Sequence, residues 1–76
     1  MIRELGLVVL LRALPEYGLQ AGDIGTVVHA YSNAAGYEVE FAAASGETVA
    51  VATLAADEVR PFSEREILHS RTLSAV

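Results

Sequence analysis

The strongest constraint on the fold is a two-residue alternation of apolar and charged side chains in the middle of the chain. Residues 37–41 read Tyr-Glu-Val-Glu-Phe. Successive side chains of a strand point to opposite faces, so the three apolar residues share one face and Glu38 and Glu40 share the other. This pattern predicts a half-buried antiparallel strand whose two glutamates are solvated. It favours an all-β fold.

Four further segments are rich in residues that favour strands and are bounded by glycine, proline or turn residues. They are residues 7–11, 24–31, 48–54 and 58–60. Gly25 lies inside the second of them, where a glycine marks either a bulge or a close approach of another backbone. Pro61 ends the last strand or places it at a sheet edge, and residues 55–57 form one helical turn before it. With a long loop at 12–22, these strands predict a small five-stranded SH3-like barrel.

The last stretch of the chain has a different pattern. Ser63 and Glu66 are spaced as a capping box, in which a serine begins a helix and a glutamate three residues later bonds back to it. An apolar residue on each side is placed to form a hydrophobic staple. This predicts a short helix over about 64–69, and a sixth strand through 67–73 is the alternative.

Seventy-six residues without cysteine predict one domain with a small core and no disulfide or zinc-thiolate site. We assign residues 1–62 to the barrel and 63–76 to a C-terminal appendage whose last residues, 74–76, are expected to fray. Arg12 interrupts the first apolar run after seven residues, so a signal peptide is not expected. No apolar run approaches the roughly 20 residues that span a membrane. The absence of cysteine fits the cytoplasm.

A turn in the first half of the chain carries a specific resemblance. Residues 19–28 read Leu-Gln-Ala-Gly-Asp-Ile-Gly-Thr-Val-Val. Gly22 tolerates a positive φ, Asp23 can bond its own backbone, and Gly25 lets the following strand coil sharply. The pattern is similar to the turns of small SH3-like barrels, including KOW motifs and the barrel of the nitrile hydratase β subunit.

Other segments follow this turn in a recognisable order. They are Leu-Val-Val-Leu at 7–10, Leu-Pro-Glu at 14–16, the alternating strand at 37–41, and Val-Arg-Pro at 59–61. Together they resemble the bacterial family called domain of unknown function 4926, over roughly residues 2–62. The resemblance implies an SH3-like barrel in a bacterial protein and no established activity. Alanines such as those at 42–44 depart from the expected pattern.

The charge balance disfavours a nucleic-acid partner. Five arginines and no lysine face ten carboxylates, which gives a net charge of −5. Binding to phosphates needs clustered cations. Arg60, Arg65 and Arg71 form the one arginine-rich region, but glutamates interleave with them, so we expect a salt-linked scaffold there. An RNA contact like those of KOW domains is the alternative.

No constellation in the sequence predicts catalysis, a metal or a cofactor. His29 and His69 are far apart in the chain, and a metal site would need Glu38 or Glu40 to converge with His29. No serine stands in a nucleophile elbow. The Gly-Asp turn at 22–25 repels an anion and precedes a strand, unlike a phosphate loop. We therefore expect a protein that is not an enzyme.

The thirteen alanines suggest a surface for close association. Ala50 and Ala52 share one face of the fourth strand, and residues 42–44 precede it. An uncharged patch of small side chains could be an interface, and tight packing within a small barrel is the alternative.

Aromatic and aliphatic residues complete the predicted partner surface. By analogy with the groove of SH3-like barrels, we name Tyr17, Tyr31 and Tyr37 as candidates, and Ile67 and Leu68 in the C-terminal segment. The sequence thus predicts a non-catalytic protein-interaction module that forms homo-oligomers or binds another protein. An antitoxin or immunity-type neutraliser of a basic partner is a more specific alternative.

Overall fold

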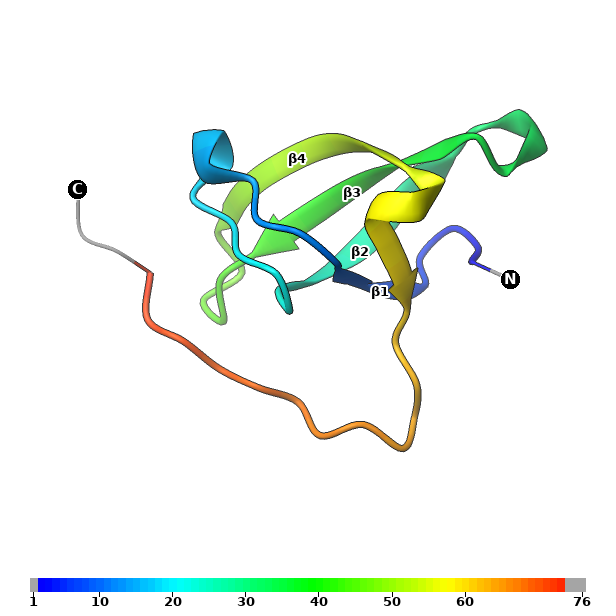
Figure 1. Ribbon diagram of the computed structural model, residues 1–76. Coiled ribbons are helices and arrows are strands. Elements are labelled where there is room, and N and C mark those ends of the chain that lie inside the picture. Colours follow the sequence, from blue (N-terminus) through cyan, green and yellow to red (C-terminus); the bar gives the residue numbers. More distant parts are fainter. Residues whose placement is uncertain (1, 74–76) are drawn as a thin grey trace.

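The computed structural model describes residues 2–73 and arranges them as five antiparallel strands in one curved sheet (Figure 1). The strands are β1 (Leu7–Leu10), β2 (Ile24–Ala30), β3 (Gly36–Ala42), β4 (Thr48–Ala55) and β5 (Val59–Pro61). Three 3-10 turns lie in the connections: η1 (Pro15–Tyr17), η2 (Ser32–Ala34) and η3 (Ala56–Glu58). The all-β prediction is confirmed, and each strand begins and ends within one residue of its predicted bounds.

The sheet order is β4-β3-β2-β1-β5. Strands β1 to β4 pair with their neighbours in sequence as a meander, and β1 pairs on its other side with β5, so that Val9 lies opposite Arg60. Strands β4 and β5 stand at the two ends of this order and are not paired with each other among the described residues. The sheet therefore curves into a partly open barrel with two edges.

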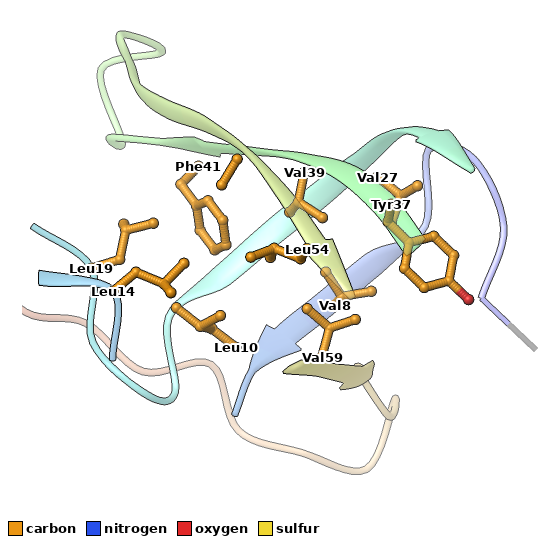
Figure 2. Close-up of a cluster of buried hydrophobic side chains, with 11 residues drawn as sticks. Val8, Leu10, Leu14, Leu19, Val27, Tyr37, Val39, Phe41, Leu54 and Val59 are labelled. Atoms are coloured by element: carbon orange, nitrogen blue, oxygen red, sulfur yellow. The ribbon is translucent and has the colours of Figure 1, made fainter. Parts of the chain in front are cut away.

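The inward face of this sheet forms a single apolar core (Figure 2). It contains alternate residues of the strands, as their two-residue period requires. Leu14 and Leu19 reach it from the long loop, where their backbones bond to each other on either side of η1. The core residues are Val8, Leu10, Leu14, Leu19, Val27, Tyr37, Val39, Phe41, Ala52, Leu54 and Val59.

Gly25 is required by a close approach within the core rather than by a bulge. A Cβ at this position would lie 2.5 Å from Cγ1 of Val39 and 2.9 Å from Cε1 of Phe41. The register shift of β2 occurs further on, between Val27 and His29. Of the two meanings that a glycine in a strand can have, the backbone approach is the one found here.

The C-terminal prediction is wrong for residues 63–73, which contain neither the helix nor the sixth strand. The capping contacts do form, because Ser63 N–H donates to Glu66 Oε1 at 2.8 Å and Arg65 N–H donates to Ser63 Oγ at 3.2 Å. They close a single turn. A helix this short depends on packing an apolar face, and Ile67 is 91% exposed, so no staple forms and the turn does not propagate. The predicted fraying of 74–76 lies outside the described residues.

Beyond the turn, the segment runs without regular structure along one side of the barrel, orange to red in Figure 1. Before the turn, the Phe62 N–H donates to the carbonyl of Leu7 at 3.1 Å, which continues the β1–β5 ladder by one bond. Within residues 2–73, no helix has the length and apolarity to cross a membrane.

Candidate functional site

Two arginine–carboxylate pairs fasten the C-terminal segment to the barrel. At the first, both Nη atoms of Arg60, on β5, donate to Glu66, with Nη1 2.8 Å from Oε1 and Nη2 2.6 Å from Oε2. This paired geometry is the strongest form of a guanidinium–carboxylate contact. The bonds from Arg60 and from the Ser63 N–H lower the pKa of Glu66 from its ordinary value of 4.5 to about 2. Glu66 therefore stays charged over the whole neutral range.

The second pair joins the segment to the Gly-Asp turn before β2. Arg71 Nε donates to Asp23 Oδ1 at 2.8 Å, and its Nη2 donates to Asp23 Oδ2 at 2.6 Å and to the carbonyl of Gly18 at 3.0 Å. Asp23 also accepts the N–H of Gln20 at 2.8 Å. The bond from Arg71 lowers the pKa of Asp23 below its ordinary value of 3.8, against the opposing effect of partial burial.

The turn itself has the predicted construction. Gly22 adopts φ of +95°, a conformation that L side chains rarely adopt, and Asp23 bonds back across the turn to Gln20. No pattern in the sequence indicates that Asp23 also holds Arg71, because the two residues are far apart in the chain and neither belongs to a motif that contains the other. The sequence predicts a scaffold in which the arginines pair with neighbouring glutamates. Arg60 does so through Glu66, whereas Arg71 pairs with the distant Asp23.

Residues 66–71, which we call the clamped loop, thus have an ion pair at each end. Between the two pairs, Ile67 is 91% exposed and Leu68 is 68% exposed. Neither side chain packs against the barrel core, and both face solvent. The loop therefore presents an apolar pair whose flanking backbone is tied to the barrel at two points.

A groove of about 850 Å³ lies between the clamped loop and the barrel. One wall is the turn at 19–24, a second is the β3–β4 connection at 42–44, and a third is the segment at 69–73. Phe41 and Val49 lie at its apolar floor. The alanines at 42–44 thus line this groove, and they are not continuous with an exposed alanine face on β4.

The outer face of the sheet carries the two solvated glutamates of β3. Glu38 accepts bonds from the hydroxyl of Tyr31 and, at 2.7 Å, from that of Thr53, while Glu40 accepts the hydroxyl of Thr48 at 2.5 Å. The bond from Tyr31 is the main cause that lowers the pKa of Glu38, and the same bond raises the pKa of Tyr31. Both carboxylates face away from the core.

Three of the predicted partner-surface residues are placed differently from the expectation. Tyr37 is 5% exposed and belongs to the core, and Ala52 is fully buried. Ala50 is partly buried and packs against the same core. The prediction of an accessible surface is wrong for Tyr37 and Ala52, because β3 and β4 direct these side chains into the core, whereas Ala50 keeps part of its surface exposed.

The remaining predicted residues are exposed but do not converge. Tyr17 and Tyr31 are each 42% exposed. Tyr17 belongs to η1 and Tyr31 immediately precedes η2, and Figure 1 shows these two turns at opposite ends of the barrel. A single aromatic groove that contains both side chains is therefore excluded. Ile67 and Leu68 are the adjacent pair among the predicted residues.

The ionisable groups offer little for a metal or an anion. No cluster of three or more potential metal ligands occurs in the part of the chain that the structure describes, and Nδ1 of His29 lies 3.4 Å from Oε2 of Glu4. Among the ion pairs that form within residues 2–73, three of the five arginines take part: Arg60, Arg71, and Arg12, whose Nε lies 3.4 Å from Oε2 of Glu58. These cations are directed to the protein's own carboxylates.

Comparison with known proteins assigns the barrel to a family. The family model described as "Domain of unknown function (DUF4926)" matches residues 4–61, which span β1 to β5. No curated protein matches the chain, and no solved structure matches it.

Proposed function

Because the chain belongs to the DUF4926 family, whose function is unknown, we propose a role from its own surface: a non-catalytic protein-interaction module that binds a partner protein through the clamped loop. The observation that carries the proposal is the exposure of Ile67 and Leu68 between two bidentate arginine–carboxylate pairs. We further propose that it acts in the bacterial cytoplasm, which a chain without cysteine suits.

Pre-ordering supports this choice of surface. A flexible apolar segment loses conformational freedom when it binds, at about 0.5–1.5 kcal/mol for each side chain that is immobilised. Here Arg60 and Arg71 tie both ends of the loop to the barrel before any partner arrives. A loop ordered in this way needs less of the contact energy for its own immobilisation, so two aliphatic side chains can act as an anchor.

The groove beside the loop offers a second part of the same contact. Its floor is apolar at Phe41 and Val49, and its rim carries Asp23 and Arg71. An apolar centre with a polar rim is the usual anatomy of a protein interface. We propose that a partner segment lies along the groove while Ile67 and Leu68 contact its flank.

The chemistry of the partner divides two versions of this function. The outward carboxylates Glu38 and Glu40 and the net charge of −5 favour a basic protein, as an antitoxin or immunity-type neutraliser would require. An RNA-binding role of the KOW type has less support, since three of the five arginines already pair with carboxylates. It would require strongly salt-dependent binding.

The test is affinity capture of partners from the source organism with the wild-type chain and a double variant, Ile67→Ser with Leu68→Ser. We expect one protein to be retained by the wild type and lost from the double variant. The matched control is Leu5→Ser, which changes a leucine that is 78% exposed outside the loop and should retain the partner. Retention by all three proteins, or equal loss from both variants, would contradict the assignment of the contact to the loop.

A further inference from the structure

The two edges of the sheet are protected very differently. Strand β5 is three residues long, ends in Pro61, and contributes Arg60 to an ion pair. Short length, proline and charge are the usual means by which an edge strand avoids pairing with another chain. Strand β4 has none of these features: it spans eight residues, Thr48–Ala55, with no charged residue and no proline.

The backbone groups of β4 that face outward can be identified from the register. Tyr31 N–H donates to the carbonyl of Gly36, so Gly36 directs its backbone groups toward β2 and not toward its β4 partner, Ala55. Gly36 and Ala55 are therefore a non-bonded pair, and Ala55 directs its backbone groups away from β3. Bonded and non-bonded pairs alternate along an antiparallel ladder, so Thr53 and Val51 also direct their N–H and carbonyl groups away from β3.

A second observation agrees with this assignment. The N–H of Ala55 donates to the Glu58 side chain at 2.8 Å rather than to β3. No backbone bond joins Val51 or Thr53 to any segment outside β3 among the described residues. The side chain of Val51, on the face of the sheet beside this edge, is 51% exposed.

We propose that β4 pairs with β4 of a second copy of this chain, antiparallel and about a two-fold axis at Ala52. In this register Val51 of each copy lies opposite Thr53 of the other, and both residues present the free backbone groups that the pairing needs. The two five-stranded sheets then join into one continuous sheet. This is an additional interface and does not involve the clamped loop, so it stands independently of the proposed function.

A second copy is favoured over another occupant for reasons of symmetry and charge. An antiparallel strand with alternating donors and acceptors is complementary to itself when it is centred on one residue. Each copy carries a net charge of −5, so copies repel wherever charged surfaces meet. Strand β4 is an uncharged edge along which they can approach, although Glu47 and Asp57 lie just beyond its ends. Added salt should therefore strengthen the association.

The test is sedimentation equilibrium of the full chain, together with amide hydrogen exchange. We expect the mass to rise to twice that of the monomer as the chain concentration approaches about 1 mM. In the dimer, the Val51 and Thr53 amides should be protected from exchange. Val51→Lys should raise the dissociation constant by about tenfold, because it adds like charges beside the axis. Val28→Lys is the matched control, since Val28 is 43% exposed on the same sheet but lies on the inner strand β2.

A second pair of variants separates the backbone contact from the side chain. Thr53→Pro removes the outward N–H and should abolish the dimer, whereas Thr53→Val keeps that N–H and should leave it intact. A monomeric wild type at about 1 mM, equal dissociation by Val28→Lys and Val51→Lys, or rapid exchange of the Val51 and Thr53 amides within a dimer would each overturn the proposal. The Ile67→Ser, Leu68→Ser variant should still dimerise, which distinguishes failure here from failure of the loop contact.

Discussion

The barrel and the clamped loop are held in place by different forces. The barrel depends on a core of eleven apolar residues that exclude water, whereas the loop depends on the two carboxylates of Asp23 and Glu66. Apolar burial responds weakly to pH, while an ion pair disappears when its carboxyl is protonated. The two parts of one small chain should therefore come apart under different conditions, and the following experiments test that separation.

The largest effect is expected from Leu10→Ala in the core. Leu10 is 1% exposed, and removing a buried leucine side chain costs about 2–5 kcal/mol. A domain of this length has about 4–11 kcal/mol of total stability, so urea unfolding should show a large loss. The neighbouring Leu11 is 47% exposed, and Leu11→Ala should change stability by no more than about 0.5 kcal/mol. Similar losses at both positions would contradict the assigned core.

The next effect tests the close approach at Gly25. Gly25→Ala forces a methyl group against Val39 and Phe41 and should destabilise the barrel by about 1–3 kcal/mol. Because the nearest atom is Cγ1 of Val39, adding Val39→Ala should relieve part of the clash. The two losses, measured by chemical unfolding, should then sum to more than the loss in the double variant. Strict additivity would show that the clash lies elsewhere.

A smaller effect is expected from acid. Asp23 and Glu66 both have a lowered pKa in the folded protein, so their contribution is fully present above their ordinary values of 3.8 and 4.5. It is lost as the pH falls through the folded values, toward about 2 for Glu66. The N–H groups of Gln20 and Ser63 bond to these two carboxylates, so their amide exchange should accelerate over this interval while β2, β3 and β4 remain protected.

The control for the acid experiment is Asp23→Asn, in which the Arg71 end of the loop should already be free at neutral pH. Raised salt should weaken the same contacts, because both pairs are partly exposed and screened. If the loop and the barrel lose protection together in every condition, the two parts are one cooperative unit and the comparison fails.

The smallest effect is expected from Ile67→Ser. A side chain that is 91% exposed contributes little to folding, so its thermal midpoint should remain close to that of the wild type. A clear drop in the midpoint would mean that Ile67 packs against the barrel, and the apolar loop would then be part of the fold rather than a contact surface.

The strands could be predicted because their causes are local. Alternation at 37–41, branched residues elsewhere, and glycine or proline at the boundaries each act over a few residues. The same alternation placed Tyr37 beside Val39 and Phe41, on the buried face. The expectation of an exposed Tyr37 came from analogy with SH3 grooves, and the local pattern was the better guide.

The C-terminal segment could not be predicted because its causes are distant. A capping box specifies a turn, but whether a helix follows depends on a surface to pack against, which the sequence does not reveal. Arg71 meets Asp23 only because the barrel brings the Gly-Asp turn to that side. Two residues this far apart in the chain show no pattern of composition or spacing that would predict their contact.

The pairing of β1 with β5 has a consequence for the order in which the chain folds. The β2–β3–β4 meander joins neighbours along the sequence and can form by successive hairpins. Val9 and Arg60 instead lie near the two ends of the barrel, so their pairing requires closure of nearly its whole length. During synthesis, the ribosome must therefore extend the chain past Pro61 before β5 can pair with β1. Until then, one edge of β1 remains unpaired.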